Sequence, residues 1–441
     1  MYIKEVKIKN IRSISHFEMD FPKPAGWHVL IGDNGAGKST IIRAIAATLI
    51  GPEEITAVLP VWEEWLKQDE NEGSIVLEIE RDTKLDGISQ TRPPKIQAIK
   101  NLFELKRNGR IELKSNIFDK NMNPRNFNWG NNKGWFSVAY GPFRRFTGGN
   151  DKWNKVFYAA LKAGAHLSVF GEDIALTEAL DWLKELDRKR LKQNESQQML
   201  VGMHEPEVKY VSESEQTFEA IKTFINTSGL LPHNAYFDSV NIEGDLIFRD
   251  GNGLPIKMIQ MSDGYRSILS LTFELIRQLV GNYSANAVFK EIRKGKPTTM
   301  VIDLPGVVLI DEIDAHLHPT WQTRIGQWFT KYFPNIQFIV TTHSPLVCRA
   351  CENGSIWRLA APGSGNESGE ITGTYKKRLI YGNVLDAYGT EVFGENVSIS
   401  EESNDKMNRL TLLNNKSMEG ETSDVEEQEL SELKSFLTPI L

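Results

Sequence analysis

Cysteine is scarce in this sequence, and long apolar runs are missing altogether. The only cysteines, Cys348 and Cys351, cannot build a disulfide framework, and no second C-x-x-C pair is present to complete a four-cysteine zinc site. No run of about 18 apolar residues occurs, so no segment is predicted to span a membrane. The N-terminal segment alternates apolar and charged side chains instead of forming the apolar stretch of a signal peptide. We therefore expect a protein of the reducing cytoplasm.

An excess of positive charge is also missing. The formal net charge is −7 at pH 7 and the isoelectric point is about 5.8, which argues against a protein whose whole surface binds nucleic acid. A local groove lined by basic side chains is one alternative. The other is that these side chains form the solvated end of a helix. The candidate groove residues are Lys184, Arg188, Lys189, Arg190 and Lys192.

The hydrophobic pattern predicts an α/β protein in which short apolar strands alternate with amphipathic helices. Strands are expected at residues 2–11, 14–21, 26–32, 74–82, 305–314, 336–344 and 355–360, and a hairpin at 244–260. Helices are expected at residues 39–50, 52–72, 171–193, 213–228, 264–279 and 319–333. Residues 84–135 are polar and weakly patterned, and we expect a mobile loop at residues 121–135.

A glycine-rich sequence, GDNGAGKS at residues 32–39, lies between a predicted strand and a predicted helix and satisfies the phosphate-loop pattern G-x-x-x-x-G-K-[ST]. Glycines let the backbone wrap around phosphate oxygens, and the helix N-terminus adds partial positive charge. Lys38 is expected to reach the β- and γ-phosphates of ATP, and Ser39 to hold Mg²⁺. The residues predicted to bind nucleotide here are Gly32, Asn34, Gly35, Ala36, Gly37, Lys38, Ser39 and Thr40.

Polar side chains follow two later apolar strands. Asp311 and Glu312 come directly after the sequence VVLI, and His343 follows the next predicted strand. Ligands of open α/β sheets bind at the carboxyl ends of the strands, where such side chains emerge. Asp311 suits the binding of Mg²⁺, and Glu312 suits polarising an attacking water. The sequence therefore predicts Glu312 and His343 as catalytic residues, and Ser39 and Asp311 as metal-binding residues.

A fourth segment, MSDGYRS at residues 261–267, precedes a predicted helix. It offers a hydroxyl, a flexible glycine and free amides at a helix N-terminus, which together suit a second anion site. The alternative is a simple helix cap made by Ser262 or Asp263. If the segment binds nucleotide, Ser262 and Gly264 are the residues that carry the interaction.

These four segments, in this order, resemble the ABC ATPase superfamily. GDNGAGKS is similar to Walker A, QMSDGYRS to the signature motif, VVLIDE to Walker B and TTHS to the switch histidine. The resemblance implies an ABC-type α/β head, with a mixed sheet and a phosphate loop, that hydrolyses ATP. It also implies a homo-oligomer, at least a head-to-tail dimer, in which the phosphate loop of one copy faces Ser262 and Gly264 of another. The family's glutamine loop has no clear counterpart, and Arg144 or Arg145 lies in about that region.

The sequences DEIDAHLHP and IKNIRSISHFEMDF resemble the RecF, SMC and OLD-like branch of this superfamily. Residues 165–186 and 381–398 resemble the ATPases of bacterial anti-phage systems, most of all the Septu (PtuA) family. That family implies an HNH-type partner nuclease (PtuB-like), nucleic acid contacted through the complex, and no membrane. Three alternatives stay open: a DNA-repair ATPase that clamps DNA, a PARIS-like ATPase with a Toprim-type effector, and a nucleotide-dependent scaffold with little turnover.

The resemblance divides the chain into four parts. Residues 1–83 are predicted to form an N-terminal ATPase lobe with Walker A, and residues 84–230 a mixed loop and helical insertion. Residues 231–360 are predicted to form a C-terminal ATPase lobe with the signature, Walker B and the switch histidine. Residues 361–441 are predicted to form a linker and a small helical C-terminal extension.

Overall fold

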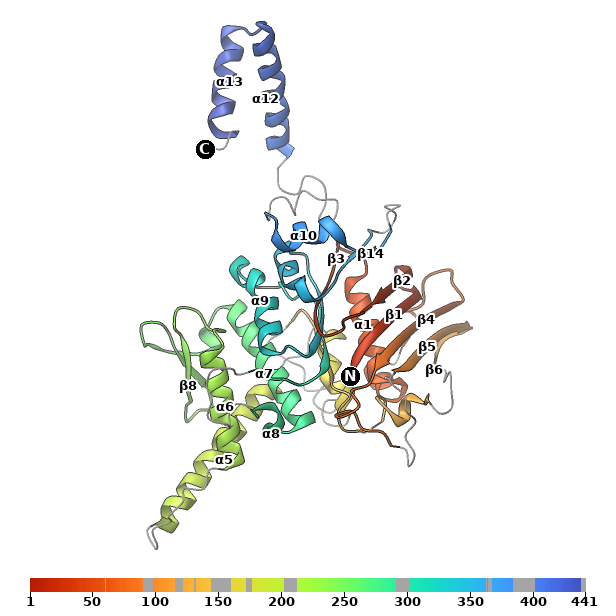
Figure 1. Cartoon of the computed structure of the whole chain (residues 1–441), viewed down its shortest axis with the longest axis vertical. Helices are drawn as coiled ribbons and strands as arrows, with labels where there is room; N and C mark the ends of the chain where they lie inside the picture. The colour runs from red at the N-terminus through yellow and green to blue at the C-terminus, as the bar shows by residue number, and fades with distance from the viewer. Residues whose placement is uncertain are drawn as a thin grey trace. The chain divides into compact units, whose positions relative to one another are not determined.

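The computed structural model describes residues 1–59, 61–89, 98–115, 122–130, 132–143, 160–171, 177–201, 212–290, 301–361, 363, 367–383 and 401–437. The chain divides into two compact units, Met1–Tyr381 and Gly382–Leu441 (Figure 1). The four-part division expected from the sequence is finer than this and stays a prediction. Among the described residues, no helix is long and apolar enough to cross a membrane.

A six-stranded sheet forms the centre of the first unit. Its strand order is β14 (Gly369–Glu370), β13 (Ile356–Leu359), β3 (Gly26–Gly32), β12 (Ile336–Thr341), β11 (Gly306–Ile310) and β7 (Ser137–Tyr140). All neighbours are parallel except the β13–β14 pair. Strands β11 and β12 are buried at every position, which explains why their sequences are continuous apolar runs. Because β3, β12 and β11 are adjacent and parallel, their carboxyl ends lie along one edge of the sheet.

A five-stranded antiparallel sheet lies beside the parallel one. Its strand order is β2 (Ile14–Asp20), β1 (Tyr2–Ile11), β4 (Glu72–Glu80), β5 (Ala98–Asn108) and β6 (Arg110–Ser115). Buried and partly exposed residues alternate along β4, as expected for a sheet with one face towards the core. The sequence predicted no strand within residues 84–135, but β5 and β6 lie there and extend this sheet. Most polar residues of these two strands are partly or fully exposed, but Asn101 is buried within β5 and interrupts its apolar pattern.

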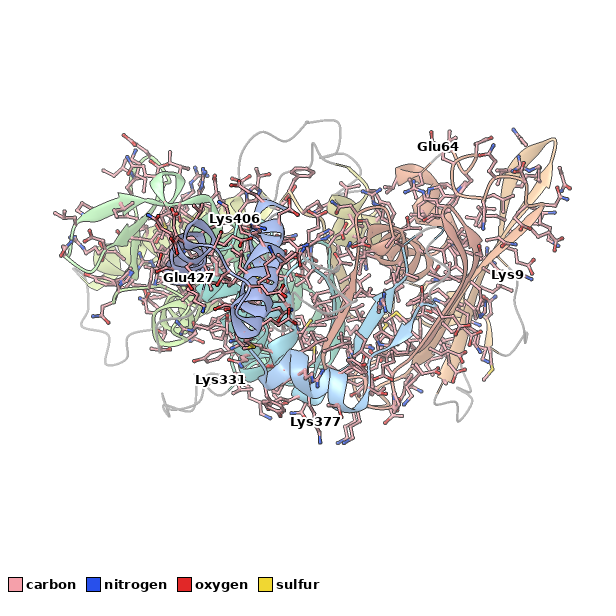
Figure 2. All side chains as sticks on the ribbon, turned by 90° about the horizontal axis from the view of Figure 1, so that it is seen from above. Lys9, Glu64, Lys331, Lys377, Lys406 and Glu427 are labelled. Carbon is pink, nitrogen blue, oxygen red and sulfur yellow. The ribbon has the colours of Figure 1, made fainter. Side chains whose placement is uncertain are left out.

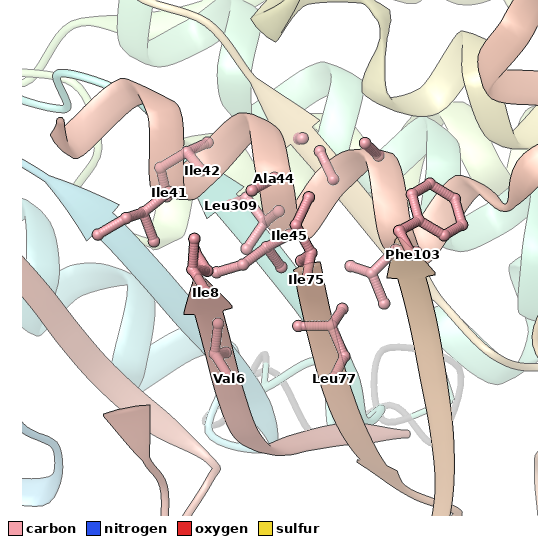
Figure 3. Packing of buried hydrophobic residues seen from close by; sticks show 14 of the residues in the cluster. Val6, Ile8, Ile41, Ile42, Ala44, Ile45, Ile75, Leu77, Phe103 and Leu309 are labelled. Carbon is pink, nitrogen blue, oxygen red and sulfur yellow. The ribbon is translucent and has the colours of Figure 1, made fainter. Parts of the chain in front are cut away.

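Helix α1 (Lys38–Ile50) packs between the two sheets (Figure 3). Ile8 of β1, Ile75 of β4 and Phe103 of β5 approach it from the antiparallel sheet, while Leu309 of β11 approaches from the parallel one. Eleven of its residues are buried, so the helix is apolar on nearly every side and not merely along one stripe. The helix that begins at the phosphate-loop sequence is therefore fixed by the main hydrophobic core.

The remaining elements of the first unit include a three-stranded antiparallel sheet of β8 (Tyr236–Val240), β9 (Leu246–Arg249) and β10 (Pro255–Lys257). Strands β9 and β10 confirm the hairpin predicted at residues 244–260. The helices are α2 (Pro52–Val58), α4 (Leu161–His166), α5 (Glu178–Val201), α6 (Glu213–Thr227), α7 (Asp263–Tyr283), α8 (Ala285–Val288), α9 (Pro319–Tyr332) and α10 (Gly373–Tyr381). Short 3₁₀ helices occupy Pro124–Asn126, Leu167–Val169, Met258–Gln260 and Pro345–Asn353. The helix expected over residues 52–72 was too long, since α2 ends at Val58.

The second unit contains a helical hairpin of α12 (Glu401–Glu419) and α13 (Asp424–Leu437). Leu413, Leu430 and Leu433 form its small core. Two ion pairs join the helices, Arg409 with Glu429 at 2.7 Å and Lys416 with Glu426 at 2.7 Å. These contacts confirm the small helical extension predicted for the C-terminal part of the chain.

Candidate functional site

The glycine-rich loop turns sharply at the carboxyl end of β3. Gly35 has a φ of 79° and Gly37 a φ of 100°, a backbone conformation that favours glycine. A Cβ added to Gly37 would also lie 3.1 Å from Ile14 and 3.2 Å from the Ser13 hydroxyl. Gly37 caps α1 without any side-chain hydrogen bond, and the first turn carries no acidic residue. The first amides of α1 therefore keep their capacity to bind an anion.

The Lys38 side chain lies over this loop. Its ammonium donates hydrogen bonds to the carbonyl oxygens of Gly32, at 2.7 Å, and Asp33, at 2.9 Å. Burial lowers the pKa of Lys38, and the nearby carboxylates of Asp311 and Glu312 oppose that shift. The electrostatic effect shows that the loop lysine and the acid pair share one edge of the sheet, as the sequence predicted.

A threonine on β12 anchors the acid pair. The Thr341 hydroxyl donates to Oδ1 of Asp311 at 2.6 Å and accepts the backbone N–H of Glu312 at 2.7 Å. Asp311 is 1% exposed, whereas Glu312 is half-buried and has a positive φ of 47°. A positive φ is unusual for a residue with a side chain, so the backbone is constrained at Glu312. Sequence reasoning missed the role of Thr341, although its place at the end of an apolar strand was the available signal.

His343 is exposed and lies on a turn that follows β12. The turn is held on both sides, since Ser344 N–H donates to the Thr342 hydroxyl at 2.9 Å and Thr342 N–H donates to Leu30 O at 3.2 Å. The latter bond ties the turn to β3, which precedes the glycine-rich loop. The structure therefore places His343 at the same sheet edge as Lys38 and Asp311.

The segment at residues 261–267 lies against the loop that follows the acid pair. A Cβ added to Gly264 would meet the His316 carbonyl oxygen at 2.7 Å, so this position is confined to glycine by close backbone approach. Tyr265 contacts Trp321 through a 3.3 Å hydrogen bond and an edge-to-face ring pair. Ser262 is exposed and occupies the cap position of α7, but its side chain makes no capping hydrogen bond.

The four motif segments are not all joined within one chain. Within the part of the chain that the structure describes, no hydrogen bond links Ser262 or Gly264 to residues 32–39. The exposed Ser262 hydroxyl is thus presented to solvent and is not used as a helix cap. A contact between Ser262 and a nucleotide held by another copy stays a prediction.

A pocket of about 500 Å³ adjoins the glycine-rich loop. It is lined by Ser13 of the β1–β2 connection and the first four residues of β2, by Ala36, and by Leu359, Ala360, Glu367 and Ser368 near β13 and β14. Sequence reasoning did not find this pocket, because its walls come from three distant parts of the chain.

Other residues singled out in the sequence have plainer surroundings. Along α5, Lys184 pairs with Asp181, Lys189 with Glu185 and Arg190 with Asp187, at 3.8, 3.4 and 2.6 Å, which favours a solvated helix end over a nucleic-acid groove.

Cys348 and Cys351 are buried free thiols, and burial raises the pKa of each. No metal-binding group of three or more His, Cys, Asp or Glu residues occurs among the described residues. Arg144 and Arg145 lie outside the described residues.

A phosphate-loop helix beside the acid pair Asp311 and Glu312, at the edge of a mixed sheet in an α/β fold, defines an ABC-type ATPase head. Residues 28–349 match the family described as "AAA domain, putative AbiEii toxin, Type IV TA system", and the chain belongs to this family.

The chain is similar to the Septu protein PtuA of Bacillus mycoides (strain KBAB4), with 26% identity over 80% of this chain and 40% of that protein. It is also similar to the retron Ec83 probable ATPase of Escherichia coli, with 44% identity over 26% of this chain and 19% of that protein. The chain thus spans less than half the length of these relatives. An SMC head bound to the C-winged helix domain of ScpA matches 84% of this chain and 97% of the solved chain, with 16% identity and a TM-score of 0.47. The fold assignment rests on the sheet topology and motifs given above.

Proposed function

We propose that this protein binds and hydrolyses ATP at the carboxyl edge of the parallel sheet. The observation that carries the proposal is the convergence of Lys38, the acid pair and His343 on three adjacent strand ends. The amides of the glycine-rich loop and α1 bind the phosphate oxygens, and Lys38 neutralises their charge. The neighbouring 500 Å³ pocket takes the nucleoside, because its walls include Ala36 of the loop itself.

The residues at this edge fit Mg²⁺. The Asp311 carboxylate is buried, is oriented by Thr341, and lies close enough to Lys38 to influence its pKa. A buried carboxylate and a serine hydroxyl are the oxygen ligands that Mg²⁺ takes beside a triphosphate, so Ser39 and Asp311 would hold it. When bound, Mg²⁺ offsets the negative charge that develops on the phosphate oxygens.

Glu312 and His343 act on the reacting end of the nucleotide. Glu312 accepts a hydrogen bond from the attacking water and polarises it, because it follows Asp311 at the strand end and is more exposed than Asp311. His343, on its fixed turn, donates to the γ-phosphate or to the same water. Both roles need only groups that the sheet edge already presents.

The complete site forms between two copies of the chain. Its support is the exposed Ser262 hydroxyl, which is not consumed in capping α7, and the confined Gly264 beside it. In the assembled site, Ser262 and the N-terminus of α7 from one copy approach the γ-phosphate held by another. The cofactors are therefore ATP and Mg²⁺, and the functional state is a homo-oligomer.

Mixing two inactive variants tests this arrangement. Lys38→Ala removes the loop cation, and Ser262→Arg blocks the opposing surface. Each alone is expected to lose ATP turnover, whereas a refolded or co-expressed mixture is expected to recover part of it, because mixed dimers contain one intact site. Turnover that never recovers in the mixture, with hetero-oligomers shown by differential tags, would contradict the shared site.

We further propose that the ATPase acts in anti-phage defence and controls a partner nuclease of the HNH type. The support is similarity to the Septu protein and retron ATPases, together with the lack of a three-residue metal-binding group in the described part of this chain. Co-purification with the product of the adjacent gene tests the proposal. A chain that purifies alone under mild conditions and protects cells from phage without that gene would contradict it.

A further inference from the structure

Asp314, two residues beyond Glu312, lies in a tightly constrained loop. The residues on either side of it, Glu312 and His316, have positive φ values of 47° and 64°. Backbone hydrogen bonds from Ala315 N–H to Glu312 O and from Leu317 N–H to Asp314 O, both 3.0 Å, close the loop on itself. These constraints hold the backbone of the loop at Asp314 without any help from its carboxylate.

The Asp314 carboxylate points back to the turn that carries His343. Its Oδ2 accepts the backbone N–H of His343 at 3.4 Å. Thr341, two residues before His343, makes the hydrogen bonds to Asp311 Oδ1 and from Glu312 N–H that are described above. The ends of β11 and β12 are therefore joined at two successive places, first at Thr341 and then at Asp314.

The second oxygen of Asp314 shows that this carboxylate is not half of a structural ion pair. Oδ1 is shielded from solvent and has no hydrogen-bond partner among the described residues, and no salt bridge of Asp314 occurs there either. A shielded carboxylate oxygen without a partner costs free energy, so its retention calls for a reason other than stability. The charge of Asp314 also acts on Lys38 across the site, where it raises the pKa of the lysine against the effect of burial.

We infer that Asp314 is a positioning residue for His343. It holds the histidine turn at the distance from the acid pair that the reaction needs, and it does so through one backbone hydrogen bond. The inference rests on the proposed ATPase function. Asp314 itself touches neither the nucleotide nor the water in this account, so its hydrogen bond acts through His343.

A double-mutant cycle on turnover tests the inference. Asp314→Ala removes the acceptor, and we expect kcat to fall by on the order of 10²-fold, the scale for a catalytic group displaced by about 1 Å. His343→Ala is expected to lose at least as much, and the double variant to lose no more than His343→Ala alone. Asp314→Asn keeps an oxygen that accepts His343 N–H, so it is expected to retain kcat within about threefold.

The control is Asp250→Ala, which removes a carboxylate that also accepts backbone N–H groups, from Asn252 and Leu254, but in the β9–β10 turn. It is expected to leave kcat unchanged. Losses that multiply in the double variant, or wild-type kcat in Asp314→Ala, would overturn the inference. So would an Asp314→Asn variant as impaired as Asp314→Ala, because the charge and not the hydrogen bond would then matter.

Nucleotide affinity separates this inference from the proposed function. The ratio of ATP to ADP affinity, measured on the same proteins, is expected to fall by the same factor in Asp314→Ala and His343→Ala, while thermal midpoints stay close to the wild type. A wild-type chain that binds neither nucleotide overturns the proposed function itself. A wild-type chain that binds ATP, beside an Asp314→Ala variant with an unchanged ratio, overturns only the positioning role.

Discussion

The two sheets that enclose α1 differ in what their strands present to their surroundings. Strands β11 and β12 of the parallel sheet are buried at every position, and Thr341 at the carboxyl end of β12 meets Asp311 just beyond β11. Strands of the antiparallel sheet have one outer face, on which side chains such as Lys9 point to solvent (Figure 2). Cross-strand ion pairs lie there, Lys100 with Glu78 and Lys106 with Glu72, each at 3.2 Å.

The two sheets therefore have different roles: the parallel sheet carries the predicted site residues, and the antiparallel sheet supports α1. A buried strand end can hold a carboxylate in a fixed direction away from bulk water, where its electrostatic effect on a bound group is strong. Water and salt screen the charges on the outer face of the antiparallel sheet, and none of the predicted site residues lies on that face. The antiparallel sheet instead supplies the apolar wall that fixes α1, and with it the start of that helix at Lys38.

The largest expected effect lies at the parallel edge, in Glu312→Gln. If Glu312 polarises the water, turnover should fall by about 10²- to 10⁴-fold while ATP still binds. Phosphate release under steady-state conditions, with ATP affinity measured alongside, checks this. Turnover near the wild-type rate would show that Glu312 is not the catalytic residue. The proposed difference in role between the two sheets would then lose its main support.

An intermediate effect is expected at the helix between the sheets. Ile45 is fully buried on α1, and Ile45→Ala should lower the free energy of unfolding by about 2–5 kcal/mol through lost burial and a cavity. Urea unfolding followed by circular dichroism gives the value. Ile45→Val, which removes one methyl group, is the matched control and should cost only about 0.5–1.5 kcal/mol. Equal losses of unfolding free energy in the two variants would contradict tight packing of the two sheets around Ile45.

The smallest effect is expected on the outer face of the antiparallel sheet. Lys100 and Glu78 are directly opposed on β5 and β4, with side chains 50% and 31% exposed. Lys100→Ala should therefore change the free energy of unfolding by less than about 1 kcal/mol and leave turnover unchanged. The same unfolding and phosphate-release assays apply. A clear loss of turnover would mean that this face takes part in the function.

The same contrast explains what the sequence could predict. Strands β3, β11 and β12 were found because full burial makes a continuous apolar run, and the polar residues after each run marked the site. Strand β5 was missed because residues 101–103 are buried in succession and residues 107 and 108 are exposed in succession, which interrupts the alternation. The roles of Thr341 and Asp314 depend on contacts between β11 and β12 that are about 30 residues apart in the chain. Spacing alone does not reveal such contacts.

ATP affinity of Lys38→Ala, compared with Lys100→Ala as a control for the loss of one lysine, tests most directly whether the buried edge grips the triphosphate. The account predicts that Lys38→Ala weakens ATP binding by about 10- to 100-fold, the scale of a charge-assisted hydrogen bond, while Lys100→Ala binds as the wild type does. Wild-type ATP affinity in a folded Lys38→Ala protein would contradict it.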